Sequence, residues 1–326
     1  MGAILSSSID GVQRTLRERV TVSGVGVHSG KPVSMAIGPA DPDTGISFVR
    51  TDLAGFAAAE IPAHVTSVGA TELCTMLAAP SGASVATVEH LLAALSGLGV
   101  DNAVVEIDGP EVPAMDGSAD LFVDAIDQTG VMVQAAQRRF LKVLKPVRVE
   151  LGRSYAEFRP FDGRRFEIQI EYECAVIGSQ KIVVDLTASV FRNEVARART
   201  FGHLDNVEQL WSAGFALGSS LENSVVIADG AVMNPEGLRW RDEFARHKVL
   251  DAIGDMALAG APIFGLYRSF RGGHKLNAAA LRALLADESA WEIVTGPARE
   301  RRAAQGELTG EATPALAAAA FAADQS

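Results

Sequence analysis

Residues 87–98 read TVEHLLAALSGL, and this stretch decides the fold class. Its leucines recur at positions 91, 92, 95 and 98, which is the spacing of one apolar face of an α-helix. Thr87 precedes this face and is expected to cap the helix. A strand is expected at 102–107, then a turn at 109–113 and a second helix from Ser118 to about Gly130. Strands and helices that come in blocks, rather than in strict alternation, indicate an α+β fold.

The same patterns extend in both directions along the chain. Residues 13–52 alternate apolar and polar side chains between glycine breaks, which predicts several short strands. Residues 131–139 lose this pattern and suggest a linker. Further strands are expected at 141–151, 155–160, 166–172, 180–185 and 262–270, with helices at 241–258 and 277–287. We therefore expect an N-terminal domain at 13–133, a C-terminal domain at 139–296 and a flexible, alanine-rich tail at 297–326.

The two expected domains share a local pattern. When Glu89 is aligned with His247, LLAAL at 91–95 lies over VLDAI at 249–253. Each of these segments is followed by an expected strand and another helix. The pattern favours two domains that are copies of one plan.

The composition restricts the classes of function. A chain of 326 residues with 48% hydrophobic residues can bury a substantial core. Its net charge of −11 argues against nucleic-acid binding, but a local group of basic residues would still allow an anionic small molecule. Cys74 and Cys174 are far apart and lack metal-site spacing, as in reduced proteins. Because neither a signal peptide nor a membrane-spanning stretch is evident, we expect a cytoplasmic protein without stable membrane insertion.

His247 and Asp251 are the first candidates for metal ligands. Their spacing of four places both side chains on one face of the expected helix, one turn apart, and Asp255 continues that face. A solvated polar face would give the same spacing. The neighbouring residues at 249, 250, 252 and 253 are apolar, however, so the helix is expected to be buried. Polar side chains on a buried helix need partners, and a metal ion is one candidate.

Glu89 and His90 form a second candidate pair. An acidic residue in the first turn of a helix stabilises the helix dipole, which would account for Glu89 without a functional role. If the two helices pack together, His90 could complete a set of two histidines and one carboxylate. Three protein ligands leave a coordination position for water, as in catalytic zinc sites, and the same set also suits Fe(II).

Two further segments contain candidates with weaker signals. His274 follows Gly272 and Gly273, and is expected on a flexible loop where either a catalytic group or a plain turn could lie. Thr200 offers a hydroxyl group beside a glycine break, which alone is a weak indication.

Together these segments resemble the UDP-3-O-acyl-N-acetylglucosamine deacetylases, the family of the committed step of bacterial lipid A synthesis. The resemblance extends over about residues 13–294, in the family's order. The matching stretches are 13–16, 24–30, 44–46, 50–52, 87–95, 101–102, 113–119, 198–202, 218–223, 242–244, 246–248, 250–255, 273–274 and 276–277. No single stretch carries the resemblance, which is specific because so many motifs occur in order.

The resemblance implies two α+β domains of similar plan, each a β-sheet packed on helices, with the active site at their interface. It also implies a zinc ion and an acylated UDP-sugar substrate. The implied zinc ligands are His90, His247 and Asp251. In the implied roles, Glu89 is the base, His274 the acid, Asp255 its positioning partner and Thr200 an oxyanion donor. The implied substrate contacts are Lys248, Phe201, Phe215 and Arg271, of which Phe201, Phe215 and the insert at 202–220 line a passage for the acyl chain and Arg271 lies near the diphosphate.

Other readings of the sequence stay open. A non-catalytic nucleotide-sugar binding protein would share the duplication and the acidic composition, but would not require Glu89, three ligands and His274 together. A metal amidohydrolase for another acetylated sugar is the second alternative. We expect a monomer.

Overall fold

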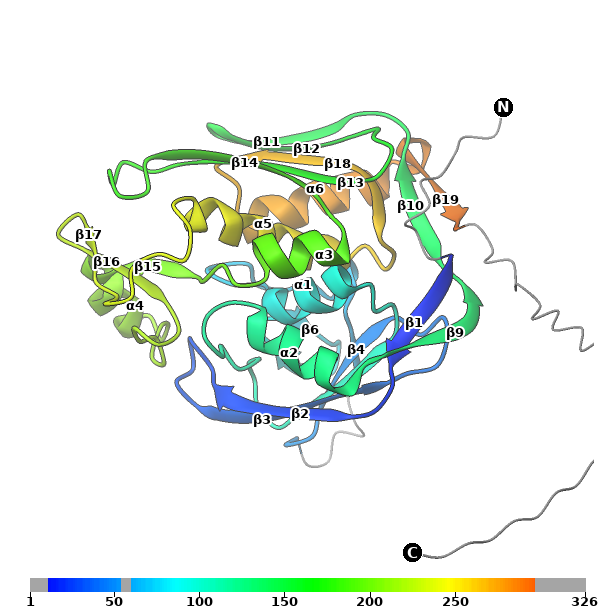
Figure 1. Cartoon of the computed structure of the whole chain (residues 1–326), viewed down its shortest axis with the longest axis horizontal. Coiled ribbons are helices and arrows are strands. Elements are labelled where there is room, and N and C mark those ends of the chain that lie inside the picture. Colours follow the sequence, from blue (N-terminus) through cyan, green and yellow to red (C-terminus); the bar gives the residue numbers. More distant parts are fainter. Residues whose placement is uncertain (1–10, 54–59, 297–326) are drawn as a thin grey trace, which may run out of the picture.

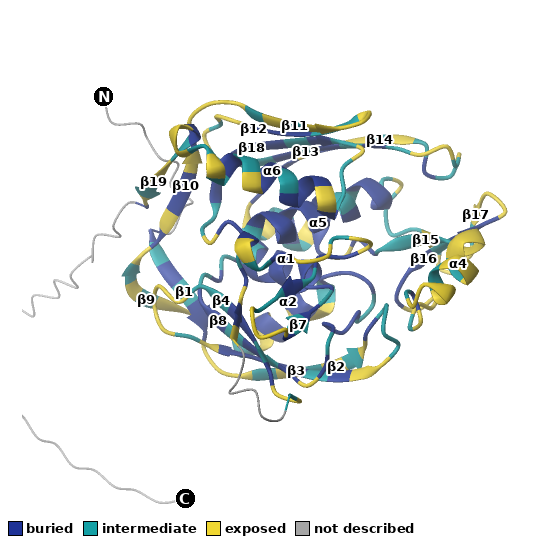
Figure 2. Cartoon of the chain, turned by 180° about the vertical axis from the view of Figure 1, so that it is seen from behind, coloured by how far each residue is buried: buried dark blue, intermediate teal, exposed yellow. Residues whose placement is uncertain are grey.

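The computed structural model describes residues 11–53 and 60–296. Two sheets form the outer layers and the main helices lie between them, so the α+β prediction is confirmed (Figure 1). The helices of the middle layer are largely buried (Figure 2). The predicted tail at 297–326 lies outside the described residues. Within the described residues, the structure contains no helix long and apolar enough to cross a membrane.

The first sheet has the strand order β2-β3-β8-β4-β5. The central strand β8 is antiparallel to β3 and parallel to β4. It follows helix α1 and precedes helix α2, both of which cover the inner face of this sheet (Figure 1). The bounds are β2 (Val20–Val25), β3 (Pro32–Pro39), β4 (Ile46–Arg50), β5 (Glu60–Pro62), α1 (Glu89–Leu98), β8 (Ala103–Ile107) and α2 (Asp120–Thr129).

Five strands of the seven-stranded second sheet repeat this plan in the order β11-β12-β18-β13-β14. Its central strand β18 is antiparallel to β12 and parallel to β13, and it connects helix α5 to helix α6. The short strand β10 pairs in parallel with the start of β18, and it also pairs antiparallel with β19. The bounds are β10 (Arg139–Val143), β11 (Val147–Leu151), β12 (Ser154–Arg159), β13 (Arg164–Glu171), β14 (Ser179–Asp185), α5 (Glu243–Ala257), β18 (Ile263–Phe270), α6 (His274–Ala286) and β19 (Trp291–Thr295).

The two halves therefore share one topology. In each, two hairpins are followed by a helix, and the strand after that helix lies between the hairpins. Helix α1 corresponds to α5, β8 to β18 and α2 to α6, as the alignment of Glu89 with His247 predicts. In β13 the alternate residues Phe166, Ile168 and Ile170 are buried, which is the pattern of a sheet with one covered face. Buried side chains from both halves form one continuous core.

The predicted linker at 131–139 is wrong. Residues Val131–Gln137 form strand β9, which pairs antiparallel with β1 (Val12–Leu16). The stretch lacks a continuous apolar face because this two-stranded ribbon is half exposed, so its sequence does not show the usual strand pattern. The domain limits 13–133 and 139–296 stay a prediction.

Three local predictions also need correction. Thr87 does not cap α1: Val88 is the N-cap residue, and the Thr87 hydroxyl donates a hydrogen bond to Glu111. Helix α2 begins at Asp120, two residues later than expected. Helix α6 begins at His274, three residues earlier than expected, so His274 lies in a buried first turn and not on a flexible loop.

Helices α1 and α5 cross at very close range. A Cβ atom added to Gly254 of α5 would lie 2.0 Å from the carbonyl oxygen of Glu89 in α1. Only glycine allows this approach of the two backbones. The crossing brings the first turn of α1 beside the middle of α5, where the candidate ligands lie.

The segment from 201 to 232 projects beside the helical layer (Figure 1). It contains β15 (Phe201–His203), α4 (Val207–Ser212), β16 (Val225–Ala228) and β17 (Ala231–Val232). Trp211 and Leu217 of this segment are about half exposed.

Candidate active site

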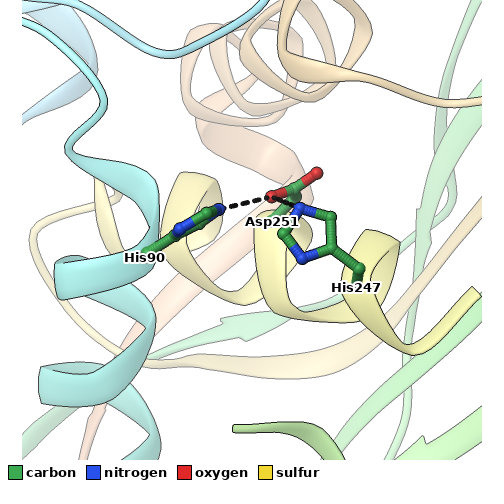
Figure 3. A group of neighbouring side chains, drawn as sticks. All are labelled: His90, His247 and Asp251. Atoms are coloured by element: carbon green, nitrogen blue, oxygen red, sulfur yellow. Dashed lines mark ion pairs between the residues drawn. The ribbon is translucent and has the colours of Figure 1, made fainter. Parts of the chain in front are cut away.

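Three candidate ligands meet where α1 crosses α5. His90 projects from α1, and His247 and Asp251 project from α5 (Figure 3). The Nε2 atoms of His90 and His247 lie 3.5 Å and 3.3 Å from Asp251 Oδ1. The two imidazole rings are nearly perpendicular, with centroids 5.0 Å apart. The candidate ligand atoms of all three residues lie within 4.8 Å of one another, so the group can hold one metal ion.

The tautomer of His247 is set by the backbone. Its Nδ1 lies 3.0 Å from the carbonyl oxygen of Ala198. A carbonyl oxygen only accepts hydrogen bonds, so Nδ1 carries the hydrogen and the lone pair of Nε2 faces Asp251. Burial lowers the pKa of His247 to about 3, with like charge from His90 and Lys248 adding to burial and Asp251 opposing it. The neutral ring is the form that binds a metal.

Asp251 has one oxygen in need of a partner. Its Oδ2 accepts a hydrogen bond of 2.9 Å from Lys248 Nζ, whereas the buried Oδ1 has no hydrogen-bond partner among the described residues. Burial alone would raise the pKa of Asp251, but His247, Lys248 and His274 hold it well below its usual value. An ionised, buried oxygen without a partner is costly. A metal ion between Asp251 and the two histidines would supply the missing partner.

A carboxylate and an imidazole lie beside this group. Glu89 Oε1 is 3.6 Å from His274 Nε2, and His274 Nε2 is 3.9 Å from Asp251 Oδ2. Burial raises the pKa of Glu89 against the opposing effect of His274 and His90. Burial would lower the pKa of His274, but Asp255, Glu89 and Asp251 outweigh it and raise the value to about 10. His274 is therefore a cation at neutral pH, with a carboxylate on either side.

Asp255 holds the other side of the His274 ring. Its Oδ2 lies 3.0 Å from His274 Nδ1 and also accepts a hydrogen bond of 2.8 Å from Asn277 Nδ2. Its Oδ1 accepts a hydrogen bond of 2.6 Å from Thr75 Oγ1. Tyr267 completes the chain by donating to Asn277 Oδ1 at 2.5 Å. Both oxygens of Asp255 are thus fixed, and with them the orientation of His274.

Comparison with known proteins identifies the family. The family model of LpxC, described as UDP-3-O-acyl N-acetylglycosamine deacetylase, matches residues 13–286. A UDP-3-O-acyl-N-acetylglucosamine deacetylase of Brucella ovis is 55% identical over 283 residues, which cover 86% of this chain and 98% of the relative. The chain belongs to this deacetylase family. A relative of the same name from Brucella melitensis is 54% identical over 283 residues, which again cover 86% of this chain and 98% of the relative.

The structure brings most of the residues implied by the family resemblance together. Lys248 Nζ lies beside Asp251 and 5.4 Å from the centre of the Phe201 ring. Phe201 also packs against His247, with ring centroids 6.2 Å apart. Thr200 directly precedes Phe201, and its backbone N–H donates to the carbonyl oxygen of Gly117.

Phe215 and Arg271 are not joined to the metal group by any contact found among the described residues. Phe215 packs edge-on against His28, with ring centroids 5.5 Å apart. Arg271 has a positive φ of 53° and lies 3.8 Å from Glu171. The His28 backbone N–H donates to Glu111, which also binds Thr87. Through Glu111, the loop with His28 is thereby tied to Thr87, two residues before the start of α1.

The sequence did not single out several supporting residues. Thr75 donates to Asp255 through its hydroxyl and to Glu89 Oε2 through its backbone N–H, yet it lies outside the matching stretches. Arg199 and Glu243 form a buried ion pair at 2.9 Å, which ties the segment that contains Ala198 and Thr200 to α5. Arg199 and Glu243 lie inside the matching stretches 198–202 and 242–244, but their pairing depends on the fold and has no local signal in the sequence.

Proposed function

We propose that the chain hydrolyses the acetamide of UDP-3-O-acyl-N-acetylglucosamine, giving UDP-3-O-acyl-glucosamine and acetate, in lipid A synthesis. Membership of the deacetylase family supports this reaction. The geometry adds one supporting observation: within the described residues, Asp251 Oδ1 has no hydrogen-bond partner and faces two histidines, while Glu89 and His274 lie beside the same group. A protein that only bound the nucleotide-sugar would need neither the base nor the acid.

We propose zinc as the metal held by His90, His247 and Asp251. Two imidazoles and one carboxylate suit both Zn²⁺ and Fe²⁺, and the family resemblance favours zinc. When bound, the ion would acidify water and polarise the amide carbonyl. Three protein ligands leave room for that water and the substrate.

The side chains of the chain itself divide the proton transfers. Glu89 takes the proton from the attacking water, and its position next to His90 in the sequence keeps it beside the metal group. Thr200 donates a hydrogen bond to the developing oxyanion. The sugar amine is a poor leaving group, so it must be protonated as the C–N bond breaks. His274, cationic because of Asp255, supplies that proton.

The substrate contacts follow the same proposal. Lys248 carries a positive charge at the rim of the metal group and meets the substrate, and Arg271 lies near the diphosphate. Phe201, Phe215 and the rest of the insert line a passage for the 3-O-acyl chain. We further propose that the chain acts as a monomer in the cytoplasm; its two cysteines are both free, as in proteins of a reducing compartment.

The test is acetate release from UDP-3-O-acyl-N-acetylglucosamine, measured beside the same compound without the 3-O-acyl chain. We expect release from both, with the higher kcat/KM for the acylated compound. Binding of the acylated compound without acetate release would contradict the proposal and favour the binding-protein alternative. Higher kcat/KM for the compound without the acyl chain would favour an amidohydrolase for another acetylated sugar.

A further inference from the structure

A cavity of about 240 Å³ lies at the opposite end of the α1–α5 pair from the metal group. His90 is in the first turn of α1, whereas the cavity is lined by Leu95 and Ser96 of its last turn. Ser96 lies six positions after His90, or about 9 Å along a helix axis. The cavity therefore lies apart from the three metal-ligand candidates, and Tyr267, which donates to Asn277 of the active site, forms part of its lining.

Both halves of the fold line this cavity. Phe158 and Phe166 come from β12 and β13, and Met256 comes from the last turn of α5, so one side of the cavity is apolar. Among the described residues that line it are four arginines (Arg138, Arg139, Arg164 and Arg165) and two acidic residues (Asp43 and Asp101). A chain with a net charge of −11 thus gathers an excess of positive charge here.

Three of the four arginines have carboxylate partners. Arg138 binds Asp101 at 2.7 Å, Arg139 lies 3.4 Å from Asp43, and Arg165 binds Asp185 at 2.6 Å. Arg164 differs from them. Its guanidinium donates only to the Ser96 hydroxyl at 2.9 Å and the Ser96 carbonyl at 3.3 Å, and across 11–53 and 60–296 no carboxylate forms an ion pair with it.

The position of Arg164 has a structural role, because a cation at the C-terminus of α1 stabilises the helix dipole. That role does not account for the whole side chain. A guanidinium has five N–H donors, and Ser96 engages it through only two of its nitrogens. Burial lowers the pKa of Arg164 to about 9, and the like charge of Arg138 adds to this effect against Asp101. An anion between Arg164 and Arg138 would offset both the burial of the Arg164 charge and its repulsion from Arg138.

We propose that this cavity binds a small organic oxyanion, with its carboxylate or phosphate against Arg164 and Arg138 and its apolar body against Phe166 and Met256. The volume lies below the roughly 300–1,000 Å³ of sites for drug-sized ligands, so the body is a single ring or a short chain. Because the lining comes from both halves, the ligand stabilises their packing and raises the melting temperature of the protein.

The test is isothermal titration calorimetry of the metal-loaded full chain with phenylacetate and phenyl phosphate. We expect one anion per chain and binding at least about tenfold weaker for the neutral analogue phenylacetamide, since hydrogen bonds to charged groups are the stronger ones. The carboxylate of phenylacetate can also bind a metal ion, so each titration is repeated on metal-free protein. Absence of binding by both anions would overturn the proposal, as would equal affinity for phenylacetamide.

Two variants locate the ligand. Arg164→Gln removes the charge, and we expect at least about a tenfold weaker affinity. Ala257 also lines the cavity, and Ala257→Leu is designed to narrow it without changing Arg164 or Ser96. We expect the same loss of anion affinity, at least about tenfold, in this variant. Arg192→Gln is the matched control, because Arg192 binds Asp127 and the Ala188 carbonyl away from the cavity lining. Circular dichroism checks the fold, and if Arg164→Gln does not fold, Ala257→Leu decides.

The remaining outcomes are also decisive. Unchanged affinity in Ala257→Leu would place the anion outside the cavity and overturn the proposal. If the anion still binds to Arg164→Gln but no longer binds once the metal is removed, its site is the metal group. That result would also overturn the proposal.

Discussion

The Nδ1 atom of His274 lies 3.0 Å from Oδ2 of Asp255, a residue that Thr75 and Asn277 also hold in place. This contact connects α6 to α5 and keeps the imidazole beside Glu89 and Asp251. The Asp255 carboxylate is the strongest of the charges that raise the pKa of His274 to about 10. The proposed proton donor therefore depends on its neighbour for its charge.

Replacement of Asp255 by asparagine tests this dependence. Loss of the anion lowers the pKa of His274, so the alkaline limb of kcat/KM should move to lower pH, because His274 must be protonated to act. We expect the rate at neutral pH to fall by roughly 10²-fold or more. The measurement is the pH profile of kcat/KM. Asp287→Asn, on the surface near Lys145, is the control and should leave the limb unchanged. An unmoved limb in Asp255→Asn would remove Asp255 from this role.

Glu89→Gln tests the proposed base. The glutamine oxygen can still accept the hydrogen bond from the Thr75 backbone N–H, so the local structure is kept. The base acts in its ionised form, and burial raises its pKa, so in the wild type the rate rises with pH through a limb above the usual range of glutamate. We expect the acid limb to disappear in the variant and kcat to fall by about 10²–10⁴-fold. Glu18→Gln is an exposed control. An unchanged kcat in Glu89→Gln would assign the base to another group.

Gly254→Ala tests the close crossing of α1 and α5. The new methyl group would meet the Glu89 carbonyl at 2.0 Å, so the helices must separate and His90 must move away from Asp251. We expect a loss of roughly 1–3 kcal/mol in the free energy of unfolding, as in other overpacked cores. Metal affinity, measured against a competing chelator, should fall as well. Gly152→Ala is a control, because nothing lies near its added Cβ, although its φ is also positive and brings some strain. Full metal affinity in Gly254→Ala would show that the crossing does not set the ligand geometry.

Phe215→Gln tests the proposed acyl passage. A polar side chain at this position should disfavour a long apolar chain more than a short one, because the loss follows the apolar area that is no longer buried. We therefore expect kcat/KM to fall further for long-acyl than for short-acyl substrates. Trp211→Gln, about half exposed in the same segment, allows the two positions to be compared. Equal losses for both acyl lengths in Phe215→Gln would make Phe215 only a packing partner of His28.

The sequence predicted the elements with strong periodicity and missed those set by long-range pairing. The stripes around Leu91 and Leu250 gave both long helices and the duplication. Strand β9 was missed because its partner β1 lies more than a hundred residues earlier, so that no local signal marks the pair. The two glycines before His274 predict a flexible loop, whereas tertiary contacts with Asp255 order that turn.

The same distinction applies to the site. The spacing of His247 and Asp251 predicts a pair on one helix face, and the family resemblance added His90, which the crossing at Gly254 places beside them. The ion pair of Arg199 with Glu243 and the contact of Thr75 with Asp255 join residues 44 and 180 positions apart. Such contacts depend on the packed structure and have no local signal in the chain.

The central claim is that a metal ion at His90, His247 and Asp251 is required for deacetylation. The most direct measurement is acetate release by chelated protein as Zn²⁺ is added back, in the wild type and in His247→Ala. We expect no activity without metal, a linear rise to a plateau at one Zn²⁺ per wild-type chain, and no such rise in His247→Ala. Full acetate release by metal-free wild-type protein would contradict the account.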